Sequence, residues 1–264
     1  DLKSRESYLY WMGEAYYFFH DYSTALEYFK RVLAMPDMPH NEFAKMQSLN
    51  TIGLIFQANN EHDSSDYYFE LVRDFCASRN RPHCEGMAQG NLGMNCFLRG
   101  DFERAIPLLK QDVETALAHK DFGLASGSGT VLANIYLQLN QLADAKFYMD
   151  TTFSNIALSG QSYRLRLLYP IMAKYQMLIG NPEAAREFLD SADVYERFYN
   201  RSFNSMIVLH LHQRDYMMNI TELQTEQRRK KVTRRVELFS MGAAAILFGF
   251  GFYWTRLNEK TKKQ

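Results

Sequence analysis

The side chains with the most reactive chemistry form no catalytic or metal-binding pattern. Three cysteines are too few for a closed disulfide framework, and their spacing is not that of metal ligands. Cys96 falls at a core position of the repeat described below, which indicates packing. Cys76 and Cys84 flank one predicted turn, where they would either pair in an oxidising compartment or remain free thiols. The sequence leaves both possibilities open.

Histidines, glycines and known motifs also give no active site. His210 and His212 lie two positions apart in a predicted helix, so they point in different directions and would not share a metal. The glycine-rich run at 123–129 does not match a nucleotide fingerprint and is read as the start of a helix. The sequence holds no phosphate loop, GxSxG elbow or HExxH motif. We therefore expect a protein that is not an enzyme, with no catalytic residues, no metal and no cofactor.

A small residue recurs every 40 positions along the chain, at two places in each of five periods. The first series is Gly13, Gly53, Gly93, Ala133 and Ala173, and the second, twelve residues later, is Ala25, Ser65, Ala105, Ala145 and Ala185. Large side chains keep the same register, such as Phe29 in the first period and Leu189 in the fifth. A fixed period of this length predicts a solenoid, in which stacked units bury their apolar faces against one another.

Each unit is predicted to contain two antiparallel helices. In the first unit they span residues 8–18 and 23–34, and Ser23 is the predicted N-cap of the second helix. The same break in the fifth unit reads Gly180-Asn181-Pro182, in which the glycine stops one helix, the asparagine caps the next and the proline begins it. Small residues are expected where two helices cross closely, because a larger side chain would push the backbones apart.

These positions resemble the tetratricopeptide repeat (TPR), a helical hairpin with a large–small pair and an aromatic in its first helix and an alanine and an aromatic in its second. Met12-Gly13, Tyr16, Ala25 and Phe29 match that pattern in order. The usual TPR unit has about 34 residues, so a 40-residue period implies longer helices or turns. The resemblance covers roughly residues 5–198. It implies an all-α fold: a right-handed superhelical solenoid of five TPR-like hairpins over residues 1–200.

The resemblance also implies where a ligand binds. In such superhelices the first helices line a concave groove, which holds an extended peptide or a protein segment. Carrying the groove positions of the family onto this chain gives Tyr10, Glu14, Tyr17, Asn50, Gln57, Asn91, Met94, Thr130, Asn134 and Lys174. Asparagine and glutamine suit this role because their amides pair with a peptide backbone of any sequence. The alternative is that these amides are merely solvated polar residues of the inner face.

After the repeats, the sequence predicts a long helix that leads into a membrane. Residues 201–237 are predicted to cap the array and to continue as a polar linker helix, with Met206, Ile207, Leu209 and Leu211 as the capping residues. Residues 238–255 are predicted to form a single transmembrane helix, because 238–254 is an uncharged run between basic flanks. Small residues in this run, with the linker, allow a homodimer.

The two ends of the chain lead us to expect a fragment of a longer protein. Residues 256–264 read as the start of a juxtamembrane segment that is cut short. The first residue is Asp1 rather than methionine, which suggests that a signal peptide has been removed.

The formal net charge of zero conceals two parts of opposite charge. From Arg228 onward there are ten basic residues against two acidic ones, so residues 1–227 carry a charge of −8. An acidic solenoid argues against nucleic acid as its ligand, whereas a basic tail suits anionic lipid headgroups. The positive-inside rule places the more basic flank, and hence the solenoid, in the cytoplasm. Yet the whole layout resembles the sensor half of Bacteroidetes-type membrane histidine kinases or helix-turn-helix regulators, which implies a periplasmic solenoid.

Two functions remain open at this point. The first is a non-enzymatic sensor domain that binds a peptide or protein and passes a change through the membrane helix to a cytoplasmic output domain. The second is a tail-anchored cytosolic adaptor that assembles partners at a membrane.

Overall fold

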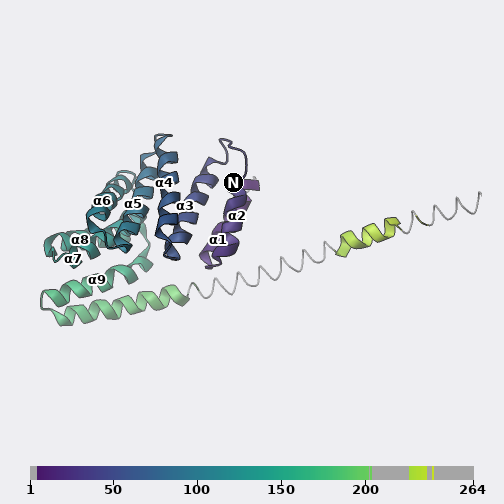
Figure 1. The fold of residues 1–264 in the computed structure, drawn as a ribbon. Helices are drawn as coiled ribbons and strands as arrows, with labels where there is room; N and C mark the ends of the chain where they lie inside the picture. The colour runs from purple at the N-terminus through teal and green to yellow at the C-terminus, as the bar shows by residue number, and fades with distance from the viewer. Residues whose placement is uncertain (1–4, 202, 204–225, 237–239, 241–264) are drawn as a thin grey trace, which may run out of the picture. The chain divides into compact units, whose positions relative to one another are not determined.

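A computed structural model describes residues 5–201, 203, 226–236 and 240. The chain divides into two compact regions, Asp1–Ser202 and Phe203–Gln264. In the described part of the first region every regular element is a helix, which confirms the all-α prediction (Figure 1). The helices are α1 (Arg5–Phe18), α2 (Tyr22–Leu33), α3 (Glu42–Ala58), α4 (His62–Ala77), α5 (Pro82–Leu98), α6 (Phe102–Ala118), α7 (Phe122–Gln138), α8 (Leu142–Ser159), the short 3-10 turn η1 (Ser162–Arg164), α9 (Leu165–Leu178), and a last helix over residues 182–201.

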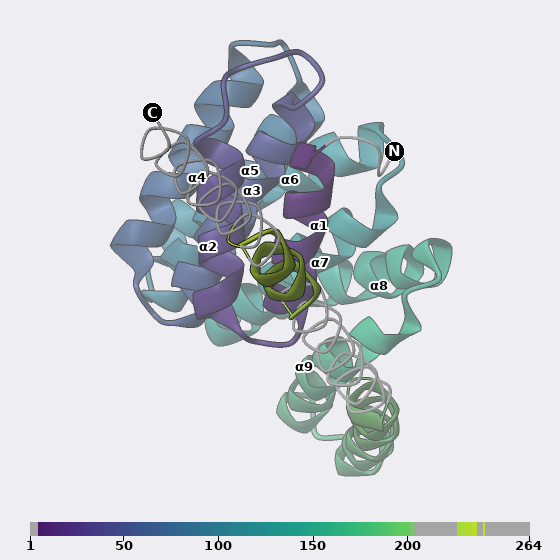
Figure 2. The ribbon, with the colours of Figure 1, turned by 90° about the vertical axis from the view of Figure 1, so that its right-hand side faces the viewer.

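The helices form antiparallel hairpins that follow one another in chain order (Figure 1; Figure 2). Each of α1, α3, α5 and α7 contacts the next odd-numbered helix, whereas none of α2, α4, α6 and α8 contacts another of these four. The odd-numbered helices are thus the more closely spaced layer. Within the first region, Asp1–Ser202, the stack of helices therefore curves toward the odd-numbered helices, which are the first helices of the repeats.

Left-handed turns recur every 20 residues, except at position 40, where a longer loop joins α2 to α3. A residue with a left-handed backbone, φ between 52° and 79°, ends a helix at His20, Asn60, Asn80, Gly100, Lys120, Asn140, Gly160 and Gly180. At most of these turns the following backbone N–H donates to a carbonyl five residues earlier, as from Asp121 to Ala116 at 2.8 Å. This is the Schellman arrangement, which satisfies carbonyls at the helix end. Helices of about 17 residues between such turns account for the 40-residue period.

The residue after each left-handed turn often caps the next helix. Asp21, Asp101, Asp121 and Asn181 each accept a hydrogen bond from a backbone N–H three residues later. The prediction for the fifth unit, a glycine stop followed by an asparagine cap, is confirmed. The prediction that Ser23 caps α2 is wrong. Asp21 accepts from the Thr24 N–H at 3.2 Å, and α2 begins one residue before Ser23.

The small residues of the period lie where the two helices of a hairpin cross. A methyl group added at Gly53 would lie 2.6 Å from the Phe69 ring, and one at Gly93 would lie 2.9 Å from Leu109. Beside these crossings an aromatic of the first helix stacks on one of the second, with ring centroids 5.5 Å apart, in the pairs Tyr16–Tyr28, Phe56–Tyr68 and Tyr136–Tyr148. Cys96 takes the place of the first-helix aromatic in the third unit, where it is buried and free, as its packing role predicted.

Several predictions for the C-terminal part lie outside the described residues. They include the capping residues 206–211, His210 and His212, the transmembrane run 238–254 and the segment 256–264. In the described residues of the second region, Phe203–Gln264, residues 226–236 form a helix whose side chains are exposed. Across the described parts of the chain, no helix combines the length and the apolar character that crossing a membrane requires.

Candidate binding surface of the first helices

Of the predicted groove residues of α1, Tyr10 is buried, whereas Glu14 and Tyr17 are half-buried. Tyr10 is 6 % exposed and packs against the rings of Phe29 and Phe43. Its hydroxyl bonds to the carboxylate of Glu14, which also accepts a hydrogen bond from Thr51 of α3 at 2.7 Å. Burial raises the pKa of both Tyr10 and Glu14 above their usual ranges. Tyr10 is thus largely covered by its neighbours, and its role in binding a ligand stays a prediction.

The predicted amides of α3 and α5 bind one another. Asn91 donates to the side-chain carbonyl of Asn50 at 2.8 Å, and Asn50 is only 8 % exposed. Gln57 donates to Asn95 at 2.8 Å, so a second amide pair joins the same two helices. These hydrogen bonds connect the second unit to the third. The amides therefore contribute to the joint between units, and their role in binding a peptide backbone stays a prediction.

Asn95 is the central residue of this polar joint, and it was missed in the sequence. Its side chain is fully buried, and besides accepting from Gln57 it donates to Ser65 at 2.9 Å and to Asp66 at 2.7 Å. Ser65 donates in turn to the backbone carbonyl of Gly53 at 2.9 Å. An asparagine in a series otherwise held by Ala15, Ile55, Ile135 and Tyr175 was the available signal.

Three other predicted groove residues do not come together. Tyr17 is half-buried beside the ring of Tyr22, and burial raises its pKa to about 12. Met94 is half-buried in α5. Thr130 is half-buried in α7, and its hydroxyl donates to the carbonyl of Ser126 one turn earlier at 2.7 Å.

The last two predicted residues, Asn134 of α7 and Lys174 of α9, line one hollow between their helices. The hollow has a volume of about 470 Å³, and its other lining residues are Leu137, Gln138, Pro170, Ala173, Met177, Leu178 and Leu189. Leu189 is 52 % exposed, whereas Phe29, Phe69, Leu109 and Met149 at the same place in the other units are at most 2 % exposed. An apolar floor with an amide and an ammonium group at its edge suits an apolar side chain carried on a polar backbone.

Comparison with solved structures establishes the fold. An aspartyl phosphate phosphatase F from Bacillus subtilis superposes with a TM-score of 0.61 at 14 % identity, covering 74 % of this chain and 51 % of that protein. A putative kinesin light chain with TPR-like repeats from Podosopora anserina superposes with a TM-score of 0.52 at 18 % identity, covering 75 % and 97 %. The chain has a TPR-like helical-repeat fold. It spans about half the length of the phosphatase. Neither a protein-family model nor a curated protein sequence matches the chain.

BtubC from P. vanneervenii also superposes, with a TM-score of 0.52 at 14 % identity, covering 69 % of this chain and 74 % of that protein. At these identities the likeness concerns the arrangement of the TPR-like units. The chemistry of any site rests on the residues of this chain alone.

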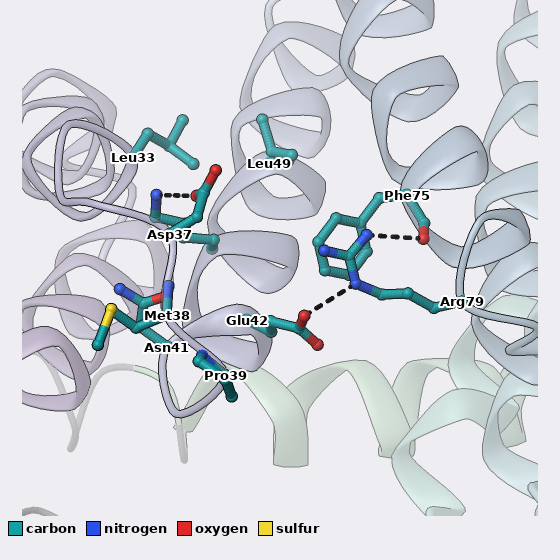
Figure 3. Close-up of a pocket in the computed structure, with 10 residues that line it drawn as sticks. Leu33, Asp37, Met38, Pro39, Asn41, Glu42, Leu49, Phe75 and Arg79 are labelled. Atoms are coloured by element: carbon teal, nitrogen blue, oxygen red, sulfur yellow. Dashed lines mark hydrogen bonds and ion pairs between the residues drawn. The ribbon is translucent and has the colours of Figure 1, made fainter.

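A second hollow lies where the TPR-like pattern is interrupted, between the first and second units (Figure 3). Helix α2 stops at Leu33, and it has 12 residues where α4, α6 and α8 have 16 to 18. The missing last turn leaves a space of about 500 Å³, lined by Leu33, Asp37, Met38, Pro39, Asn41, Glu42, Lys45, Leu49, Phe75 and Arg79. Pro36 and Pro39 were the sequence signal for this interruption.

Charged groups rim this second hollow and are paired with one another. The Arg79 guanidinium lies 3.7 Å from the centre of the Phe75 ring and donates to Glu42 at 3.0 Å (Figure 3). On the opposite side, Lys45 forms an ion pair with Asp37, which lowers the pKa of that exposed carboxyl. Asn41 donates to the Pro36 carbonyl at 2.8 Å and so holds the loop in place. The charged side chains of the rim named here, Arg79, Glu42, Lys45 and Asp37, thus form ion pairs with one another.

The cysteine pair left open by the sequence is joined in the structure. Cys76 at the end of α4 and Cys84 near the start of α5 form a disulfide, with their Cα atoms 5.8 Å apart. The bond spans the left-handed turn at Asn80 and links the second unit to the third.

Proposed function

We propose that this chain is the ligand-binding part of a membrane-anchored signalling protein, and that its TPR-like units bind a peptide or a protein segment. The observation that carries the proposal is the hollow between α7 and α9. It lies between two first helices and combines an apolar floor with the amide of Asn134 and the ammonium of Lys174. We expect it to take an apolar side chain of an extended peptide that also bears a carboxylate for Lys174.

Binding at this hollow is tested by selecting random peptides against the full chain in nanodiscs and measuring their affinity by calorimetry. Lys174→Ala should weaken a selected acidic peptide about tenfold, since it removes a charged hydrogen-bond partner. Lys146→Ala is the matched control, because Lys146 is an exposed lysine of α8 paired with Asp150 and lies outside the hollow. Equal affinities for the two variants would place the ligand elsewhere.

The signalling part of the proposal rests on the C-terminal sequence. We propose that the uncharged run 238–254 crosses the membrane and that a bound ligand shifts the curvature of the array, which passes to a cytoplasmic output domain. A ligand causes such a shift only if it binds the two curvatures with different affinity. The disulfide between Cys76 and Cys84 supports a solenoid in an oxidising compartment such as the periplasm.

A cytosolic adaptor held at the membrane is the second candidate. Its support is the basic helix 226–236, since the positive-inside rule places such a flank in the cytoplasm. Labelling of intact cells separates the two candidates. Asp63→Cys puts a thiol on a fully exposed position of α4 and leaves the left-handed turn at Asn60 intact. A membrane-impermeant reagent that labels this cysteine without permeabilisation supports the sensor, and labelling only after permeabilisation supports the adaptor.

A further inference from the structure

One acidic side chain lies deep within the junction between the third and fourth units. Asp112 of α6 is 1 % exposed. The residues at the same place in the other units are Val32, Val72, Thr152 and Ala192, and all of them are buried and uncharged. A valine or a threonine thus satisfies the packing at this position. The carboxyl group of the third unit is therefore an addition that the repeat itself does not require.

A glycine on the facing helix accommodates this carboxyl group. A methyl group added at Gly90 of α5 would lie 2.6 Å from Cγ of Asp112. The other units carry Tyr10, Asn50, Thr130 and Pro170 at the place of Gly90. The acid and the glycine occur together in one unit only, which indicates that the two residues form one feature.

The carboxyl group has few partners. Its Oδ2 accepts a hydrogen bond from the Ser128 hydroxyl of α7 at 2.5 Å, and Oδ1 has no donor among the described residues. The charged group that faces it is Asp121, the N-cap of α7, whose negative charge opposes ionisation of Asp112. Asp121 itself bonds to the His83 ring at 3.2 Å, and that ring lies 5.1 Å from the ring of His119.

These surroundings favour the uncharged form. Burial raises the pKa of Asp112 from 3.8 to about 7, the Ser128 hydrogen bond lowers it, and Asp121 raises it further. Because the pKa in the folded chain lies above the ordinary value, the folded state holds the proton more tightly than the unfolded state. Stability is therefore greatest below about pH 4 for this group, and it falls as the pH rises toward about 7.

We propose that Asp112 makes the junction between the third and fourth units respond to pH, so that the units pack closely when this carboxyl carries its proton and loosen when it is ionised. The side chain lies between α5, α6 and α7, where an ionised oxygen without a donor favours separation of the helices. Because α5 and α7 are neighbours in the layer of first helices, loosening this junction changes the spacing between α5 and α7, and α7 is one wall of the hollow proposed for the ligand.

The test compares wild-type full chain with Asp112→Asn between pH 5 and pH 8. Asparagine keeps the shape and cannot ionise. Urea unfolding should show that the folding equilibrium constant of the variant rises relative to that of the wild type as the pH increases. The rise should be up to about tenfold for each pH unit, and this gain should level off above about pH 7. Hydrogen exchange of α6 and α7 should report the same change locally. A difference that stays constant across this pH range would overturn the proposal.

A second variant distinguishes titration from packing. Ser128→Ala removes the hydrogen bond that favours the charged form, so the levelling should move to higher pH, whereas a purely structural role would lower stability equally at every pH. Asp144→Asn, at an exposed acid of α8, is the matched control and should leave the pH dependence unchanged. No ligand is used, so a negative result leaves the peptide-binding proposal standing.

Discussion

At the scale of single residues, the sizes of paired side chains decide how closely the helices of a hairpin cross. Gly13 and Gly53 face phenylalanines, Gly93 faces Leu109, and in the fourth unit Ala133 stands at the place opposite Met149. Glycine is therefore kept opposite both phenylalanine and leucine, and alanine takes its place in the fourth unit, where the partner is the unbranched Met149. The register of small residues predicted this contact from the sequence, because size and spacing suffice to identify it.

We expect Gly53→Ala to destabilise the protein by about 1–2 kcal/mol. The added methyl group overlaps the buried Phe69 ring, and this cost exceeds the helix propensity that alanine gains. Combined with Phe69→Leu, the loss should be smaller than the sum of the two single losses by about 1 kcal/mol in a double-mutant cycle. Gly127→Ala is the control, since a methyl group there meets only an Arg164 nitrogen at 3.4 Å. Additive effects of Gly53→Ala and Phe69→Leu would disprove the steric account.

Apart from the glycine stop at Gly180, the left-handed turns were not predicted, because the residues that form them differ in chemistry. Glycine and asparagine adopt a positive φ readily, but Lys120 does so at φ 59° against its steric preference. We expect Lys120→Gly to stabilise the protein by about 1 kcal/mol, measured as a higher urea midpoint. Asn140→Gly, at an equivalent turn, should change stability less, because asparagine tolerates this conformation. A loss of stability in Lys120→Gly would contradict this view.

At the scale of helices, buried polar bonds fix the position of one unit against the next. Helices and their order followed from the period, but the partners of individual amides did not. Which atoms meet depends on how α3 and α5 are rotated against each other, and a spacing of 40 residues does not set that angle to within a hydrogen bond. Asn50, Gln57 and Asn91 were thus identified as polar residues of one face, and only the structure shows that they pair.

We expect Asn95→Ala to cost about 2–4 kcal/mol, because it removes hydrogen bonds to Gln57, Ser65 and Asp66 and leaves buried groups without partners. Hydrogen exchange in α4 and α5 should accelerate more than in α7 and α8. Asn91→Ala removes one bond from a less buried side chain and should cost only about 1 kcal/mol. If both variants lose the same stability, the buried network adds nothing beyond single hydrogen bonds.

At the scale of the whole molecule, the local character of a repeat array explains which predictions could be made. Each unit contacts its neighbours, so a pattern of about 40 residues predicts the hairpin and the stacking. Features that belong to one unit break the pattern, as the short α2 and the acid at Asp112 do. A single sequence shows such features only as departures from the repeat. Their consequences depend on the residues packed around them, such as those that line the hollow beside α2 and those that surround the carboxyl group of Asp112.

The disulfide connects this architecture to the compartment in which the chain folds. With Cys76 and Cys84 joined and Cys96 free, protein taken from its native compartment and denatured without reductant should react with one equivalent of thiol reagent. A chain that folds in a reducing cytosol should react with three, which would also remove the support for a periplasmic sensor.

Replacing both paired cysteines by serine should lower the free energy of unfolding by about 2–3 kcal/mol, because the bond closes a short loop in the unfolded chain. Reductant should abolish this difference between wild type and variant, whereas Cys96→Ala, which leaves the bond in place, should keep its sensitivity to reductant. Thiol counts on wild-type chain therefore report its compartment independently of any label placed on the surface.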